Sequence, residues 1–128
     1  MTDFAKQRER MVDRQLRRRG IGDERVLAAM GAVPRELFVE ERLRRRAYAD
    51  GALPTSSGQT ISQPWVVAAI TEALELSGDE RVLEIGTGSG YSTAILARLA
   101  ADVVSIERNS ALAGGARERL GELGVANV

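Results

Sequence analysis

The sequence predicts an α/β domain with a parallel sheet, helices on its faces and a helical segment in front of it. Two short apolar segments, residues 82–85 and 103–106, have the length and composition of strands. A segment with helical periodicity follows each of them, and this strand, helix, strand, helix order requires a parallel sheet. A glycine cluster between the first strand and its helix is typical of Rossmann-like ligand-binding domains.

The first part of the chain predicts helices. From Asp3 to Arg19 apolar residues recur at roughly helical spacing, and Gly20 follows as a stop. Asp23 can cap a second helix, whose apolar stripe is formed by Val26, Leu27 and Met30. The two arginine triplets, 17–19 and 44–46, are interleaved with acids, and we interpret them as solvated helix faces.

A loop separates these helices from the parallel sheet. Pro34 ends the preceding helix or opens the next segment, which continues through Leu43. The stretch 47–62 is rich in Gly, Pro, Ser and Thr, so it predicts an irregular loop. Pro64 suits the first turn of a helix running to about Leu76, with an apolar side made of Val66, Val67, Ile70 and Leu74.

The elements of the second half are expected to be buried. The segments 82–85 and 103–106 are too apolar to face water on either side. The helix between them carries Ala94, Ile95 and Leu99. A last helix runs from about Ser110 to Leu123, and Gly124 provides its stop.

Composition limits the possible functions. The 128 residues suffice for one domain, and 44% hydrophobic content is that of a globular protein. There is no Cys and no His, so we expect no metal site, no disulfide and no imidazole base. Lys+Arg and Asp+Glu are both 18, without the basic excess of a nucleic-acid binder. No apolar run spans a membrane and no signal peptide begins the chain, so we expect a cytoplasmic protein.

The strongest local motif is the segment from Glu84 to Gly90, Glu-Ile-Gly-Thr-Gly-Ser-Gly. Its glycines follow the spacing G-x-G-x-G, which is the pattern of class I S-adenosylmethionine-dependent methyltransferases. Dinucleotide sites have the spacing G-x-G-x-x-G instead. Glu84 can meet the ammonium group of that cofactor through water. Glu107 ends the second strand, 21 positions after Gly86 (107 − 86), where an acid can bind both ribose hydroxyls. The alternative is two ordinary strand-end acids around a mere turn.

A second motif lies in the loop before Pro64. It reads Ser-Gly-Gln-Thr-Ile-Ser-Gln-Pro over residues 57–64. Hydroxyl residues before a helix are usually caps, so spacing alone favours a capping role for Ser62.

Together, these segments resemble the protein-L-isoaspartate O-methyltransferase family from Met11 to Val128. The residues from Gly58 to Pro64 are specific to that family, whereas the glycine loop is shared with methyltransferases generally. Further matching pieces are Met11-Val12, Gln15-Leu16, Arg19-Gly20-Ile21, Arg25-Val26-Leu27, Val33-Pro34-Arg35-Glu36, Ala47-Tyr48, Ala52-Leu53-Pro54 and Val82 to Tyr91.

The resemblance implies specific roles for single residues. Ser62 matches the active-site serine, and Thr60 and Ser62 would contact the substrate. The loop carrying them would close over the cofactor and the peptide carboxylate. The implied cofactor-binding residues are Gln59, Thr60, Ile61, Ser62, Glu84, Gly86, Thr87, Gly88, Ser89, Gly90 and Glu107.

The resemblance also implies a reaction: methyl transfer from S-adenosylmethionine to the carboxylate of L-isoaspartyl, and D-aspartyl, residues in damaged proteins, which starts their repair. A carboxylate is already ionised at neutral pH, so the lack of His is no obstacle. The chain is expected to be the amino-terminal part of a complete, monomeric enzyme. A methyltransferase for another acceptor and an inactive fragment are the alternatives.

The implied architecture is a Rossmann-like class I methyltransferase fold, truncated after the second strand-helix unit. Residues 1–63 would form the helical extension with the substrate and cofactor loop. Residues 64–128 would form the first half of the methyltransferase domain, its carboxyl-terminal half being absent. From such a chain alone we expect little methyl transfer, because its cleft cannot exclude water.

Overall fold

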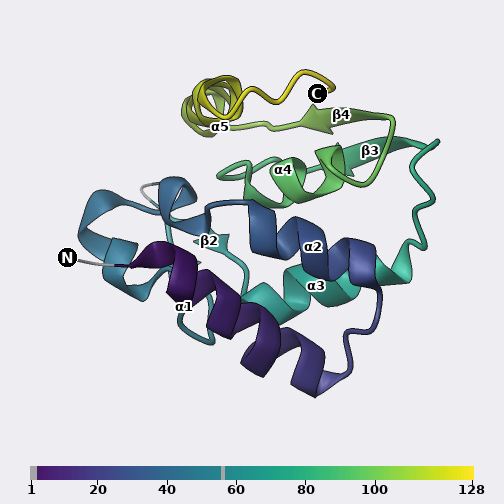
Figure 1. Cartoon of the computed structure of the whole chain (residues 1–128). Coiled ribbons are helices and arrows are strands. Elements are labelled where there is room, and N and C mark those ends of the chain that lie inside the picture. Colours follow the sequence, from purple (N-terminus) through teal and green to yellow (C-terminus); the bar gives the residue numbers. More distant parts are fainter. Residues whose placement is uncertain (1–2, 56) are drawn as a thin grey trace.

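The predicted order of helices and strands is present in the computed structural model, which describes residues 3–55 and 57–128. Helix α4 (Tyr91–Ala97) lies between the parallel strands and the helices of the first half (Figure 1). The strands β3 (Arg81–Ile85) and β4 (Asp102–Ile106) lie on one side of it. Helices α2 (Glu24–Ala32) and α3 (Pro64–Ala73) lie on the other.

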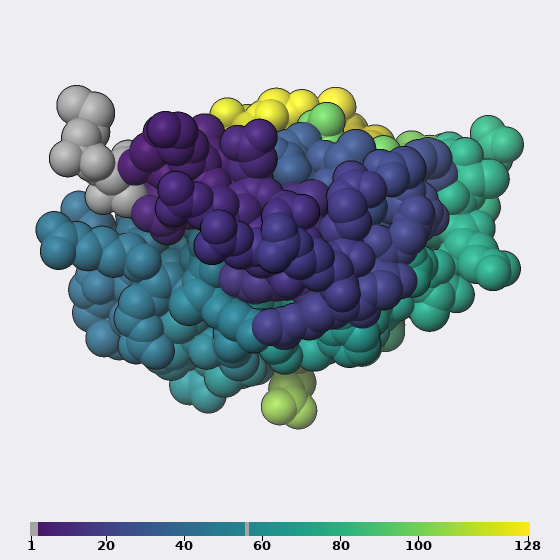
Figure 2. All heavy atoms as spheres, turned by 60° about the horizontal axis from the view of Figure 1, so that its bottom comes forward, coloured from purple at the N-terminus to yellow at the C-terminus, as the bar shows by residue number. Residues whose placement is uncertain are grey.

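The amino-terminal segment is helical as predicted, but not a single α-helix. Helix α1 (Phe4–Met11) continues as a π-helical turn, η1 (Val12–Leu16), and a 3-10 turn, η2 (Arg17–Arg19). Gly20 then takes φ +94, the left-handed conformation that stops a helix. Figure 2 shows the first half of the chain, coloured purple to teal, spread over most of one face of the molecule.

The segment predicted to be an irregular loop contains a small hairpin, so that prediction was partly wrong. After two 3-10 helices, η3 (Arg35–Phe38) and η4 (Glu41–Arg46), strands β1 (Leu53–Pro54) and β2 (Thr60–Ile61) pair antiparallel. Leu53 lies opposite Ile61, and both side chains are buried. The burial of this pair explains why a segment rich in turn residues forms strands here.

The prediction that both strands are buried on both faces was wrong. Strands β3 and β4 pair in parallel, and one face of this sheet carries side chains that are between 41% and 73% exposed, Leu83, Ile85, Val104 and Ile106. On the opposite face Val82 and Val103 pack against Leu96 and Ala100. The sequence pattern indicated apolar faces correctly, but in this structure helices cover only one of them.

Helix α3 is shorter than predicted, and its buried face differs. It ends at Ala73, and of the expected stripe Val67 is buried, together with Ala68 and Thr71, which the stripe did not include. Ile70 and Leu74 are 62% and 49% exposed, because the buried face of α3 packs against α2 on the other side of the helix. The exposed apolar side of α3 borders the same cleft as Leu83 of β3.

One hydrophobic core joins the amino-terminal helices to the sheet-bearing half. It extends through residues of nearly every element, among them Met11, Leu16, Met30, Phe38, Ile61, Tyr91, Ile95 and Leu120. Helix α5 (Ser110–Glu122) begins at the cap residue Asn109 and is followed by Gly124 at φ +72, the predicted stop. Within the described residues, no helix has both the length and the apolar character needed to cross a membrane.

A carboxylate in the turn before β3 makes the folding stability depend on pH. The carboxylate of Glu80 accepts backbone N–H bonds from Ser77 (2.8 and 3.0 Å) and Gly78 (2.9 Å). These bonds lower the pKa of Glu80 from 4.5 to about 2. The folded pKa lies below the unfolded one, so the stabilisation is complete above about pH 4.5 and disappears as the pH falls to about 2.

We therefore expect Glu80→Gln to lower Tm at pH 7 and to change it little at pH 2, as measured by circular dichroism. Glu118→Gln, at an exposed position of α5, is the matched control. An equal loss of Tm at both pH values in Glu80→Gln would contradict this account.

Candidate cofactor and acceptor site

The glycine loop between β3 and α4 presents two of its three glycines to open space. Gly86, Gly88 and Gly90 all have positive φ, at +94, +57 and +91. A Cβ added at Gly86 or Gly88 would meet nothing within 4 Å, whereas one at Gly90 would lie 3.1 Å from Cβ of Ala116. The first two glycines therefore leave room for a ligand, and the third lets α5 pack closely.

This difference predicts different effects of alanine at these positions. Gly90→Ala is expected to destabilise the fold by about 2 kcal/mol or more, because it adds both a strained φ and a close contact with α5. Gly86→Ala adds only the strained φ and is expected to cost about 1–2 kcal/mol. Urea unfolding of both variants measures the difference. Equal losses would show that the packing of Gly90 on α5 contributes nothing.

Glu84 is bound by a network of hydroxyl groups behind the glycine loop. Its Oε1 accepts hydrogen bonds from Oγ1 of Thr93 and from Oγ of Ser105, the latter at 2.7 Å. The Ser105 hydroxyl has its proton directed at Glu84, so Thr87 is the donor in the 2.5 Å contact between Thr87 and Ser105. Among the described residues none donates to Oε2 of Glu84, which leaves that oxygen as an acceptor for a cationic ligand group.

Glu107 is fixed by the loop that it faces. Its Oε1 accepts the N–H of Gly88 (2.8 Å), and its Oε2 accepts the N–H of Asn109 (2.9 Å). The bonds from Asn109 and Gly88 lower the pKa of Glu107, so it is an anion at neutral pH and only accepts hydrogen bonds. Two carboxylates thus flank the glycine loop, an arrangement that suits a ligand with an ammonium group and free hydroxyls.

Ser62 borders the same cleft as Glu84 and Gly86. The cleft has a volume of about 480 Å³, and its remaining lining is mostly apolar and comes from α3, β3 and α4. The Ser62 side chain is exposed, and the capping alternative is wrong, since Gln63 is the N-cap residue of α3 and makes no side-chain cap bond. The structure therefore brings the predicted acceptor residue and the first part of the glycine loop to one cleft.

The other predicted residues of the 59–62 segment are placed differently. Gln59 and Thr60 are exposed, and neither is among the residues that line the cleft. Ile61 is buried in the core, so only its backbone could meet a ligand. Their predicted contacts with cofactor and substrate stay predictions.

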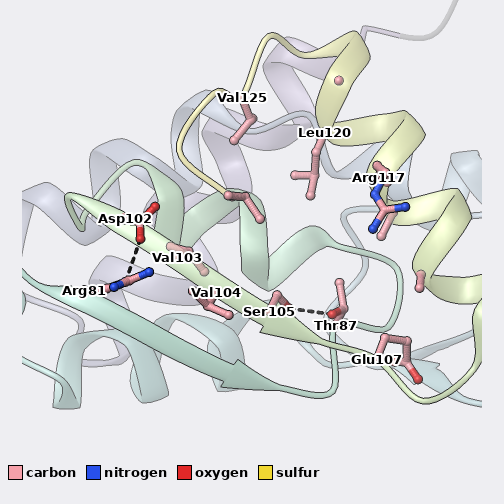
Figure 3. Close-up of a pocket in the computed structure, with 14 residues that line it drawn as sticks. Arg81, Thr87, Asp102, Val103, Val104, Ser105, Glu107, Arg117, Leu120 and Val125 are labelled. Atoms are coloured by element: carbon pink, nitrogen blue, oxygen red, sulfur yellow. Dashed lines mark hydrogen bonds and ion pairs between the residues drawn. The ribbon is translucent and has the colours of Figure 1, made fainter.

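A second cleft, of about 500 Å³, lies between β4 and α5 (Figure 3). Thr87, Ser105 and Glu107 line it at the end nearest the glycine loop. The ion pair between Arg81 and Asp102 (2.9 Å) lies toward its other end. Glu107 and Ser62 thus border different clefts, and the hydroxyl network around Glu84 lies between them. Gly86 lines the first cleft and Thr87 the second, so a ligand that uses both acids would have to bind across the glycine loop.

A match to a protein-family profile shows which family the chain belongs to. The profile of protein-L-isoaspartate(D-aspartate) O-methyltransferase (PCMT) matches residues 6–128. The chain belongs to this family. A relative named protein-L-isoaspartate O-methyltransferase, from Syntrophus aciditrophicus, is 58% identical over 128 residues. One from Methanoculleus marisnigri is 58% identical over 123 residues.

The chain spans little more than half of these relatives. The matches cover 100% and 96% of this chain, but 59% and 56% of the Syntrophus and Methanoculleus proteins. A solved protein-L-isoaspartate O-methyltransferase matches with a TM-score of 0.85 at 31% identity, covering 94% of this chain and 40% of that one.

A Plasmodium falciparum structure of the same family name, in complex with S-adenosyl-L-homocysteine, matches with a TM-score of 0.76 at 24% identity. That match covers 99% of this chain and 61% of the Plasmodium chain, and it shows the fold alone. The predicted Rossmann-like class I methyltransferase fold is confirmed by these likenesses to members of the family.

Sequence reasoning missed three residues that support the site. Ser105 and Thr93 hold Glu84, and Arg35 donates to the backbone of Ser62. A signal for Ser105 existed, because a serine inside an apolar strand is unusual and parallel pairing places it opposite Glu84. Thr93 and Arg35 gave no such signal, since no strand pairing relates them to their partners Glu84 and Ser62.

Proposed function

We propose that this chain supplies the cofactor loop and the acceptor serine of a protein-L-isoaspartate O-methyltransferase. The reaction transfers a methyl group from S-adenosylmethionine to the carboxylate of L-isoaspartyl and D-aspartyl residues in damaged proteins. The observation that carries the proposal is the cleft shared by Ser62, Glu84 and Gly86. Family membership of residues 6–128 supports it.

The residues present fit S-adenosylmethionine rather than a dinucleotide. The open space at Gly86 and Gly88 lets a ligand come into close contact with the backbone of the glycine loop. Glu84 would face the ammonium group of the methionine portion, and Glu107 the ribose hydroxyls. A pyrophosphate at the same loop would face the carboxylate of Glu84, which disfavours NAD.

The reaction needs alignment more than acid–base chemistry. S-adenosylmethionine, when bound, supplies a methyl group on a positively charged sulfur. The substrate carboxylate is already an anion at pH 7, and one of its oxygens takes the methyl group as the bond from carbon to sulfur breaks. The role left to Ser62 is to orient that oxygen, and its exposed hydroxyl at the cleft can donate to a carboxylate.

The finer features of the complete enzyme are also proposals. We infer a division near residue 63 between the extension and the methyltransferase domain. We further infer a monomeric, cytoplasmic enzyme that acts on isoaspartyl-containing proteins and peptides, without nucleic acid or membrane. A balanced charge of 18 basic and 18 acidic residues supports the exclusion of nucleic acid.

Two experiments test the function. Isothermal titration of the 128-residue chain is expected to show binding of S-adenosylhomocysteine and none of NAD. Methyl transfer is measured with a chimera that joins this chain to the remaining carboxyl-terminal part of the Syntrophus relative, using radiolabelled cofactor and an isoaspartyl peptide. Transfer to the isoaspartyl peptide but not to its normal aspartyl counterpart is the expected result. NAD binding, or transfer only to another acceptor, would overturn the proposal.

A further inference from the structure

A buried arginine joins the acceptor segment to the glycine loop. The side chain of Arg35 is fully buried. Its Nε donates to the carbonyl of Ala47 (2.6 Å), and its Nη2 donates to the carbonyl of Ser62 (3.0 Å). Its guanidinium carbon lies 4.9 Å from the ring centre of Tyr91, the residue that follows Gly90. One side chain therefore contacts both segments that form the candidate site.

A contribution to folding stability does not by itself explain why an arginine occupies this buried position. Buried charges in proteins are usually paired with an opposite charge, because an unpaired one is expensive to desolvate. No carboxylate among the described residues forms an ion pair with Arg35, and its Nη1 has no hydrogen-bond partner there. A neutral side chain of similar size would fill this part of the core without that penalty, so the guanidinium is explained better by what it positions.

We propose that Arg35 is a positioning residue that holds Ser62 in register with the glycine loop. The proposal rests on the proposed function, in which Ser62 orients the acceptor carboxylate. The planar guanidinium donates to two carbonyls in fixed directions while its central carbon lies over the ring of Tyr91. A lysine has one nitrogen and no plane, so Arg35→Lys keeps the charge but cannot reproduce the geometry.

Hydrogen exchange of the 128-residue chain tests the positioning directly. In Arg35→Lys, amides of residues 59–63 are expected to exchange more than tenfold faster, the effect of losing one hydrogen bond to a charged group on a local opening equilibrium. The matched control is Arg25→Lys, because Arg25 likewise donates to two backbone carbonyls, those of Leu76 and Leu99, away from the site. Exchange at 59–63 that rises equally in both variants would overturn the proposal.

A kinetic measurement separates positioning from loss of fold. In the chimera, Arg35→Lys is expected to lower kcat on the isoaspartyl peptide by about tenfold or more, with the KM for S-adenosylmethionine changed by less than about threefold. Arg25→Lys is expected to leave both constants unchanged, and a loss of kcat no larger than in this control would refute the positioning role.

Two further outcomes are informative. If Arg35→Lys does not fold, Tyr91→Leu, which removes the aromatic ring beneath the guanidinium and leaves the bond to Ser62, should also speed exchange at 59–63. Unchanged exchange there would count against the proposal. A wild-type chimera without any methyl transfer would contradict the proposed function, and the exchange comparison would then decide on Arg35 by itself.

Discussion

Ser62→Ala is expected to lower the turnover of the chimera on an isoaspartyl peptide by about a hundredfold, the loss typical of a misaligned reacting group. The affinity for S-adenosylhomocysteine is expected to change little, because alignment of the acceptor acts mainly on the transition state. Single-turnover methyl transfer and isothermal titration measure the two quantities separately.

The matched control for Ser62→Ala is Ser57→Ala, a serine of the same loop outside the cleft lining. It is expected to keep full turnover. The structure also predicts no loss of Tm in Ser62→Ala, because α3 is not capped by that side chain. An equal effect of the two variants on turnover, or a loss of stability confined to Ser62→Ala, would show that the assignment of Ser62 to the acceptor is wrong.

The sequence predicted the parts of the fold that local signals determine. The strand, glycine loop and helix from Arg81 to Ala97 follow from residue type and spacing within a short segment. The left-handed glycines at 20 and 124 and the cap at 23 are equally local. Asn109 was nevertheless missed as a cap, although its side chain accepts N–H bonds from Ala111 and Leu112.

Features that depend on distant partners were beyond sequence reasoning. An apolar strand face does not show whether anything covers it, and Ile85, at 73% exposed, is uncovered here. The hairpin of Leu53 and Ile61 depends on a shared position in the core rather than on strand-like patterning. The family resemblance supplied Ser62, which the residues alone favoured as a helix cap.

In the candidate site, too, some features could be predicted from local sequence and others depend on distant partners. Glu84 and Glu107 could be predicted as site residues because each lies within one residue of the end of a strand, next to a recognisable loop. The prediction did not include the second task of Glu107, which is to hold the N–H groups of Gly88 and Asn109. That task means that removing the carboxylate disturbs the loop as well as the ligand, so a simple affinity loss cannot establish the ribose contact.

A thermodynamic cycle isolates the ribose contact of Glu107. In the chimera, Glu107→Ala is expected to weaken binding of S-adenosylhomocysteine by about tenfold to a hundredfold, the effect of losing hydrogen bonds to a charged group. Removing both ribose hydroxyls from the ligand should weaken binding to the unaltered chimera by a similar factor.

The coupling between these two changes is the decisive quantity, because it cancels any general disturbance of the loop. If Glu107 accepts the hydroxyls, their removal should cost nothing further once the carboxylate is gone. The analogue without ribose hydroxyls and S-adenosylhomocysteine should then bind Glu107→Ala equally well. Additive losses in the double change would mean that Glu107 acts on the cofactor only through the backbone of Gly88, and that another group binds the ribose.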